Sequence, residues 1–194
     1  MKSKLIIFLA LLVVGFSFFS ASPSEERSKD YIYWDQRALT WADFKGAVPK
    51  SKFIALTHSA IKLDFGGEGK TIWFTIESIF YPKKSWKKKG VDDHILKHEQ
   101  GHFDITEIYA RILRKTLSET KFKKYDTIGD EVQRIFNSNF TACEKFQDAY
   151  DKETDHSKIK DEQYRWNAKI SSMLDSLSSQ TETELKMDVT YLLD

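Results

Sequence analysis

The sequence predicts an α+β fold in which an antiparallel β-hairpin precedes three helices. Two runs of alternating polar and apolar residues, one ending at Phe65 and one beginning at Thr71, flank Gly66-Gly67-Glu68-Gly69, which is the pattern of a hairpin. Further along the chain, apolar residues recur every three or four positions over three segments, as they do on amphipathic helices. With 194 residues, 41% of them hydrophobic, the chain can bury one core, and a single domain over residues 23–180 is expected.

The N-terminal segment is typical of an exported protein. Lys2 and Lys4 precede a run of about fifteen apolar or small residues from Leu5 to Phe19, shorter than the roughly 20 that a membrane span needs. Residues 1–22 are therefore expected to be a signal peptide or, if they are retained, an N-terminal anchor. The protein is expected to be periplasmic or secreted, and to contact a membrane only through this segment.

The balance of charges and the single cysteine argue against a nucleic-acid-binding protein and against a disulfide-stabilised domain. The 30 Lys and Arg residues nearly balance the 29 Asp and Glu residues, so no nucleic-acid partner is indicated. Cys143 is the only cysteine, which excludes a disulfide within the chain and suits a bacterial envelope protein. Because Cys143 falls within an apolar helical stripe, we expect a buried and unreactive thiol.

The predicted hairpin has its first strand within residues 53–65 and its second over residues 71–81. The second run is rich in β-branched and aromatic residues, which favour strands. His58 lies in the first strand, where a structural role is expected. The lysine-rich residues 83–90 after the second strand are expected to form a solvated loop, with contact to anionic lipid or glycan as the alternative.

The segments before the hairpin and after the last helix show weaker sequence patterns. Upstream of the hairpin, Trp34, Trp41 and Phe44 form an aromatic patch, which is expected to belong to the core or to cover the hairpin. At the other end, residues 181–194 have mixed polarity and no clear period. We expect them to form a weakly ordered C-terminal extension.

The three helices are predicted from the spacing of apolar residues. Asp92 is a good N-cap for the first, which continues to about Ser118. The second is expected over residues 128–150 and the third over residues 158–177. Between them lies a polar connection, residues 150–157, that is rich in carboxylates and contains one histidine.

The first helix carries the motif His98-Glu99-Gln100-Gly101-His102. Two histidines four residues apart project from one helix face, so both imidazoles can reach one metal ion while Glu99 points to its flank. A catalytic Zn²⁺ takes three protein ligands, with imidazole nitrogens at about 2.0–2.1 Å, and keeps a position for water. The motif thus predicts a zinc hydrolase site in which His98 and His102 bind the metal and Glu99 is the base that takes a proton from the activated water.

The third metal ligand is expected to come from the polar connection after the second helix or from that helix itself, and several residues are candidates. His94 is a poor choice, because it lies about 12 Å from His102 along a straight helix. The candidates are His156, the acidic neighbours Asp151, Glu153 and Asp155, and, on the second helix, Glu131 and Glu144.

Other residues near the motif suggest supporting roles. Gly101 costs about 1 kcal/mol relative to Ala in a helix, which is easier to understand where another group must approach closely. Asp104 is a candidate to orient a ligand histidine, although a surface position would explain it equally well. Tyr150 or Tyr164 is a candidate donor to a developing oxyanion, with packing as the alternative.

Several blocks together resemble a bacterial family of unknown function that is described as predicted secreted zinc-dependent proteases. They are His98-Glu99-Gln100-Gly101-His102-Phe103-Asp104, Tyr150-Asp151 with Thr154 and His156, Gln163 with Trp166-Asn167, and upstream Trp41-x-x-Phe44-x-Gly46 and Ala55-x-Thr57. The resemblance covers most of the exported part. It implies a zincin-like fold, a peptidase acting on a peptide or protein substrate, and His156 as the third zinc ligand. Ser157 departs from the family, which usually shows Gly after this histidine.

Three alternatives remain beside an exported zinc peptidase. One is a non-catalytic envelope module in which zinc is structural or the site only holds peptide or glycan. Another is an amidase acting on cell-wall peptides, which would share the site chemistry. The third is an inert scaffold that binds no metal. Four protein ligands would indicate a structural zinc, whereas three ligands and an open position would indicate catalysis.

Overall fold

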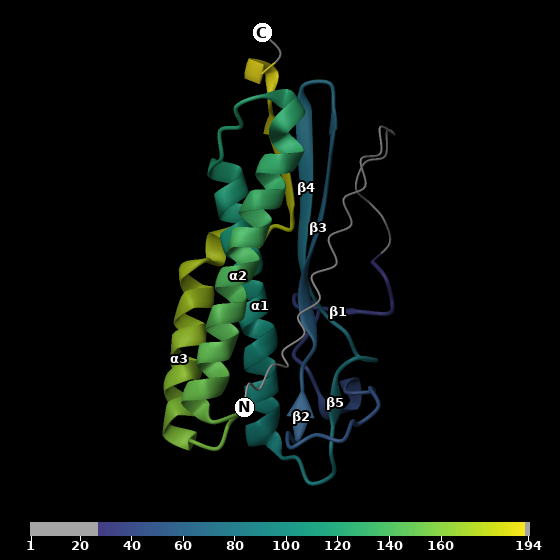
Figure 1. The fold of residues 1–194 in the computed structure, drawn as a ribbon, viewed down its shortest axis with the longest axis vertical. Coiled ribbons are helices and arrows are strands. Elements are labelled where there is room, and N and C mark those ends of the chain that lie inside the picture. Colours follow the sequence, from purple (N-terminus) through teal and green to yellow (C-terminus); the bar gives the residue numbers. More distant parts are fainter. Residues whose placement is uncertain (1–26, 193–194) are drawn as a thin grey trace.

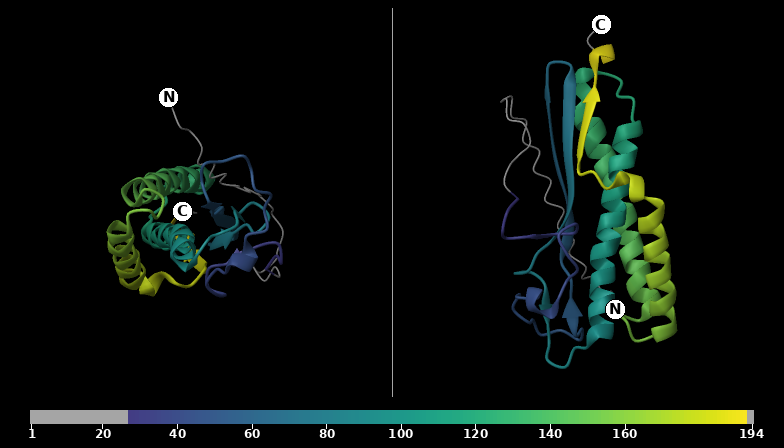
Figure 2. Two further views of the ribbon diagram at one scale, coloured as in Figure 1. Left: turned by 90° about the horizontal axis from the view of Figure 1, so that it is seen from below. Right: turned by 180° about the vertical axis from the view of Figure 1, so that it is seen from behind.

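A computed structural model describes residues 27–192, so the predicted signal peptide or anchor, residues 1–22, lies outside it. The fold is α+β, with antiparallel strands on one side and three helices on the other, as predicted (Figure 1). Helix α1 (Asp93–Glu119) lies between the strands and the helices α2 (Ile128–Thr154) and α3 (Lys160–Ser176), which is clearest in the view along the long axis (Figure 2).

The predicted hairpin is present and forms the centre of the main sheet. Strands β3 (Ser59–Glu68) and β4 (Thr71–Phe80) pair without interruption from Ser59↔Phe80 to Glu68↔Thr71. The β4 face toward the helices is apolar, since Phe74 and Ile76 are wholly buried. The first strand starts at Ser59 rather than near Phe53, because the preceding residues pair elsewhere.

Those preceding residues belong to a second, two-stranded sheet. Strand β2 (Ala55–Leu56) pairs antiparallel with β5 (Trp86–Lys87), which lies inside the stretch expected to be a loop. Sequence alternation cannot reveal such short strands, and β5 is recognisable only by the buried Trp86 among lysines. On the main sheet, β1 (Ile32–Tyr33) adds two residues to the end of β4.

The C-terminal region differs from the extension expected from the sequence. Strand β6 (Glu184–Asp188) pairs with β4 from Thr71↔Asp188 to Thr75↔Glu184, on the edge opposite β3. Leu185 and Met187 pack against the core while Glu184, Lys186 and Asp188 are exposed, which explains the mixed polarity. Val189 follows and is wholly buried.

Helix α1 begins where the sequence predicted. The Asp92 side chain accepts a hydrogen bond from the Ile95 backbone N–H at 2.9 Å, which satisfies one of the free donors of the first turn. Fifteen of its 27 residues are buried, more than one helical face provides, because sheet and helices cover opposite sides. Short 3₁₀ turns complete the described chain at Trp41–Asp43, Tyr125–Thr127, Ser178–Gln180 and Thr190–Leu192.

Two predictions about the core are confirmed. Cys143 is buried in the main core. Phe44 is buried in a smaller cluster with Phe80 and Phe103, against which Trp34 and Trp41 pack. Among residues 27–192, no helix combines the length and apolar character needed to cross a bilayer.

Candidate metal centre

Three donor atoms from two helices meet near the N-terminal end of α1. His98 and His102 lie one turn apart, and their Nε2 atoms are 3.3 Å from each other. Helix α2 runs back along α1 and brings Asp151 to the same place, with its Oδ1 3.2 Å from His98 Nε2 and 3.1 Å from His102 Nε2. Within residues 27–192, these are the three residues whose donor atoms group closely enough to hold one metal ion.

The spacing of these donors fits zinc. Four ligands at about 2.0 Å in a tetrahedron stand about 3.3 Å from one another, and the three measured separations are 3.1, 3.2 and 3.3 Å. Two imidazole nitrogens and one carboxylate oxygen are also ligands that zinc accepts. The triangle therefore has the size and chemistry of one face of a zinc coordination sphere.

Both histidines are oriented by glutamine side chains. His98 Nδ1 is 2.8 Å from Gln163 Oε1, and His102 Nδ1 is 2.6 Å from Gln147 Oε1. Since the Gln147 amide nitrogen donates to the His102 carbonyl at 2.9 Å, its oxygen must face the ring. Each Nδ1–H therefore donates to an amide oxygen, which leaves the Nε2 lone pair available for a metal.

Tyr150 fixes the ring of His98 and explains the glycine of the motif. The wholly buried Tyr150 ring stacks on His98 at a centroid distance of 4.6 Å, and its hydroxyl donates to the His98 carbonyl at 3.2 Å. A Cβ at Gly101 would lie 2.3 Å from that hydroxyl oxygen. A glycine is therefore needed where Tyr150 crosses α1, and the hydroxyl is engaged rather than free to serve an oxyanion.

The group is strongly polarised without a metal. Burial acts to raise the pKa of Asp151, but the charges and hydrogen bonds of His102 and His98 outweigh it and hold this pKa well below its usual range. Conversely, burial lowers the pKa of His102, but the Asp151 carboxylate overcomes it and raises the pKa to about 9. A metal at this position would take over the role of that proton.

Glu99 has the features expected of a base beside the metal. Its side chain is buried, and Oε2 has no hydrogen-bond partner among the described residues. Its charge contributes to the raised pKa of His102, so the carboxylate lies within electrostatic reach of the donors. Thr57, after β2, holds this turn of α1 by donating to the Glu99 carbonyl at 3.1 Å.

His156, the third ligand expected from the family resemblance, lies beside the group rather than in it. Its Nδ1 is 3.2 Å from the same Asp151 Oδ1, and its ring contacts Phe53 at 4.7 Å. Helix α2 continues to Thr154, so Asp151 is still helical and faces α1. The next three residues, including His156 and Ser157, then turn with φ of 45°, 53° and 73°, which leaves the His156 side chain 35% exposed at the rim.

The turn over residues 155–157 also explains the position of His94 and the conformation of Ser157. His94, the poor candidate, is one turn before His98, and its Nε2 lies 2.7 Å from the Ser157 carbonyl oxygen. The φ of 73° at Ser157 is a conformation that glycine adopts without strain, which fits the glycine that the family resemblance leads us to expect here.

The remaining sequence candidates are engaged elsewhere, and none of them belongs to the three-residue group. Asp104 accepts hydrogen bonds from Trp34 and Gln100, so it does not orient a ligand histidine. His58 packs against Tyr81. Glu153 accepts a hydrogen bond from Trp166, Asp155 pairs with Lys158, and Glu131 accepts one from Thr127. Glu144 lies elsewhere on α2, and Tyr164 is exposed.

Sequence reasoning missed the functions of Gln147 and Gln163. Gln147 lies one turn before Asp151, so it shares the α2 face that meets α1, and this spacing could have indicated it. Gln163 was part of the family resemblance, but the sequence around it on α3 gives no indication that its side chain contacts His98.

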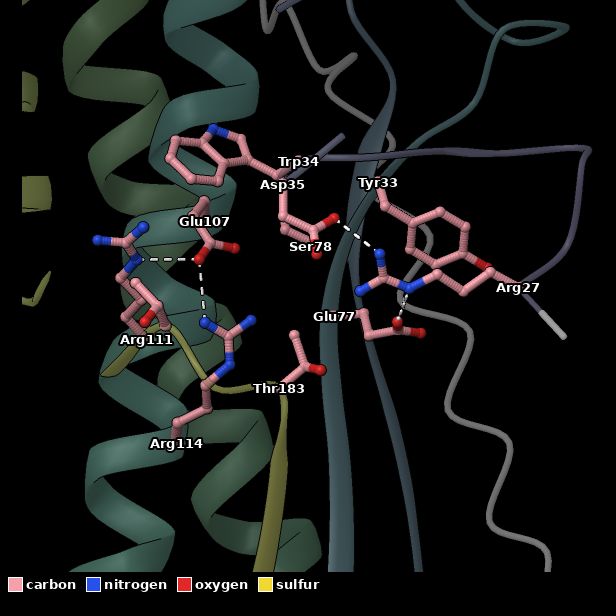
Figure 3. Close-up of a pocket in the computed structure, with 11 residues that line it drawn as sticks. Arg27, Tyr33, Trp34, Asp35, Glu77, Ser78, Glu107, Arg111, Arg114 and Thr183 are labelled. Atoms are coloured by element: carbon pink, nitrogen blue, oxygen red, sulfur yellow. Dashed lines mark hydrogen bonds and ion pairs between the residues drawn. The ribbon is translucent and has the colours of Figure 1, made fainter. Parts of the chain in front are cut away.

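A small cavity of about 80 Å³ lies farther along α1, between α1 and β4 (Figure 3). The Glu107 carboxylate at its wall bonds both Arg111 and Arg114 at 2.9 Å. Arg114 also donates to the Ile76 carbonyl, which ties α1 to the sheet. Ser78 lines the cavity with a buried hydroxyl that has no partner among the described residues. These charged side chains hold α1 against the sheet. None of His98, His102 and Asp151 lines the cavity.

The comparison with family models gives one match. Residues 82–157 match a family described as a bacterial protein of unknown function (DUF922), which confirms the resemblance to such a family over this range. The matched region contains β5, all of α1 and α2, and the turn with His156, and therefore all three donors and Glu99. Neither the search of curated proteins nor that of solved structures returned a match.

Proposed function

We propose that this protein is an exported, zincin-like zinc peptidase in which His98, His102 and Asp151 hold Zn²⁺ and Glu99 is the general base. The observation that carries the proposal is the triangle of donor atoms with sides of 3.1–3.3 Å, next to a buried carboxylate oxygen without a partner. The two orienting glutamines and the close fit of Gly101 against Tyr150 support a preformed site.

Each residue has a defined task in peptide hydrolysis. Bound zinc supplies a Lewis acid that lowers the pKa of a water and polarises a carbonyl. Glu99 accepts the proton of the attacking water on its free Oε2 and can deliver it to the leaving amine. Gln147 and Gln163 keep both Nε2 atoms directed at one point. Thr57 keeps the Glu99 turn in register with the neighbouring strand.

A closed structural zinc site is the second candidate, because His156 lies against Asp151. If His156 were a fourth protein ligand, no position would remain for water, and the site would be structural. The geometry favours the open site, since His156 contacts Asp151 but neither metal-binding nitrogen of the other two residues, and it lies outside the group of mutually close donors. Metal analysis separates the two. His98→Ala and Asp151→Ala should lose zinc, whereas His156→Ala should retain it and should not weaken its affinity.

The decisive test of the peptidase is Glu99→Gln. Because only the base is removed, the variant should bind one zinc per chain as wild type does, while peptide hydrolysis falls by about 10²- to 10⁴-fold. Hydrolysis is measured with a library of fluorescence-quenched peptides and zinc by atomic absorption. Glu119→Gln, an exposed carboxylate on the same helix, is the matched control and should cleave as wild type does.

Full activity in Glu99→Gln would show that Glu99 is not the base. Zinc-loaded wild type that cleaves cell-wall peptides but no linear peptide would favour the amidase. An absence of zinc from the purified protein, even after incubation with the metal, would favour the inert scaffold.

A further inference from the structure

Two chain segments beside the metal group carry positive charge only. Residues 45–58 and 81–91, here called the basic wall, contain eight of the chain's 30 Lys and Arg residues and none of its 29 Asp and Glu residues. They include β2 and β5, which pair with each other. In Figure 1 these strands lie beside the N-terminal end of α1, and His98 and His102 belong to the first turns of that helix.

Two contacts place the basic wall at the candidate site. Thr57 bonds the Glu99 carbonyl, and the Phe53 ring contacts His156 at 4.7 Å. Lys52 Nζ lies 5.1 Å from the centroid of the same Phe53 ring. A positive charge is therefore two side chains away from the carboxylate that joins the histidines.

Most lysines of the basic wall have no ion-pair partner among the described residues. Lys83 pairs with Asp30 at 2.9 Å, whereas the other seven lysines have no carboxylate partner within residues 27–192. Apart from Lys83, five of these lysines are exposed to solvent, and none of the five forms an ion pair with a described carboxylate. They are Lys45, Lys50, Lys52, Lys84 and Lys89. Exposed charges of one sign attract ligands of the opposite sign and raise the rate of encounter.

We propose that the basic wall binds acidic segments of the polypeptide that the site cleaves. The inference rests on the proposed function, because it names the substrate class of the same centre. A polypeptide fits better than a lipid surface, since Thr57 and Phe53 of the basic wall contact the Glu99 turn and His156 directly, which puts this wall next to the place where a peptide bond would be cleaved. Ile54, 39% exposed between Phe53 and β2, adds an apolar contact for such a chain.

The test uses zinc-loaded Glu99→Gln, so that binding is measured without cleavage. Three pools of fluorescent peptides share a randomised centre and differ only in flanks of Glu, Gln or Lys. By fluorescence anisotropy at low salt, the Glu pool should bind about tenfold more tightly than the Gln pool, and the Lys pool most weakly. The difference should largely vanish in 0.5 M NaCl, because salt screens exposed charges.

The triple substitution Lys50→Gln, Lys52→Gln and Lys89→Gln should abolish the preference for the Glu pool. The matched control replaces Lys121, Lys123 and Lys124 by Gln at the other end of α1, and should keep it. Equal binding of the three pools, or equal loss in both triple variants, would overturn the proposal. So would binding to phosphatidylglycerol vesicles, with no preference among the pools, which would assign the basic wall to a membrane.

The two proposals fail separately. If wild type with bound zinc hydrolyses no peptide while Glu99→Gln still prefers acidic pools, the peptidase is refuted and the acidic-polypeptide surface stands. If wild type cleaves all pools with the same kcat/KM and Glu99→Gln binds them equally, the peptidase stands and the surface is refuted.

Discussion

At the scale of single residues, Gly101 shows how closely the two helices fit around the metal group. We predict that Gly101→Ala destabilises the protein by about 2 kcal/mol, because its Cβ would overlap the Tyr150 hydroxyl and displace a wholly buried ring. Zinc affinity should fall with it, since Tyr150 packs on His98. Urea unfolding and zinc titration measure both effects.

The control for this prediction is the same substitution in a Tyr150→Phe background. Removing the hydroxyl removes the closest overlap, so Gly101→Ala should then cost clearly less than in wild type. An equal cost in both backgrounds would place the strain elsewhere in the helix.

His58 provides a test of pH dependence outside the metal group. Burial and the charge of Lys84 lower the pKa of His58 to about 4. The unfolded chain, with a pKa near 6.5, therefore binds a proton that the folded chain does not as the pH falls from 6.5 to 4, and the stability decreases over that range.

Replacing His58 by Phe should remove this contribution while keeping an aromatic ring against Tyr81. The loss of unfolding free energy between pH 7.5 and pH 5 should be smaller by about 1–2 kcal/mol in His58→Phe than in wild type, allowing for partial exposure. Urea unfolding of both metal-free proteins at the two pH values measures it. Identical pH dependence would mean that His58 ionises normally in the fold.

Sequence reasoning could reach some site residues and not others. His98, Glu99 and His102 follow from spacing on one helix, because a helix fixes which side chains share a face. Asp151 and His156 are five residues apart around a helix end, and the exact end decides which one faces α1. Three residues with positive φ and no glycine give no sequence signal for that end.

At the scale of elements, α1 is held by charges as well as by apolar packing. Glu107 is buried between Arg111 and Arg114, and Arg114 reaches the β4 backbone. We predict that Glu107→Gln destabilises the protein by about 3 kcal/mol, because two buried guanidinium groups lose their carboxylate.

Chemical unfolding of Glu107→Gln measures this effect, and the denaturant slope should stay that of wild type. Glu119→Gln is again the matched control, since Glu119 is 66% exposed and its contact with Lys115 is 4.0 Å, and it should change stability by less than about 0.5 kcal/mol. A change at Glu107 as small as that of the control would show that the network adds little.

Long elements were predictable because their periods are strong, whereas the short strands depended on partners distant in sequence. The helix after Asp92 and the β3–β4 hairpin are where the pattern places them. Strands β5 and β6 have two and five residues, and each is defined by the strand it joins. Local preference says little about such edge pairings, because the partner supplies the stability.

At the scale of the whole molecule, the metal group joins α1 and α2 directly and α3 through Gln163. Ligand binding to the folded state alone should therefore stabilise the entire fold. At a free zinc concentration of 100 times Kd, we expect about 2.7 kcal/mol, or a rise in Tm of about 5–10 °C.

Differential scanning calorimetry with and without zinc measures this shift. Asp151→Ala should lose the shift and His156→Ala should keep it. A shift that is lost in His156→Ala but kept in Asp151→Ala would exchange their assignments and restore the ligand expected from the family resemblance.

The central position of α1 also bears on how the site exchanges its metal. Strands cover one side of this helix and two helices cover the other, and two glutamines orient its imidazoles, so both rings are already in place before any ion arrives. Little ordering of α1 would therefore be required on capture. The protein should behave as a largely preformed receptor for the ion.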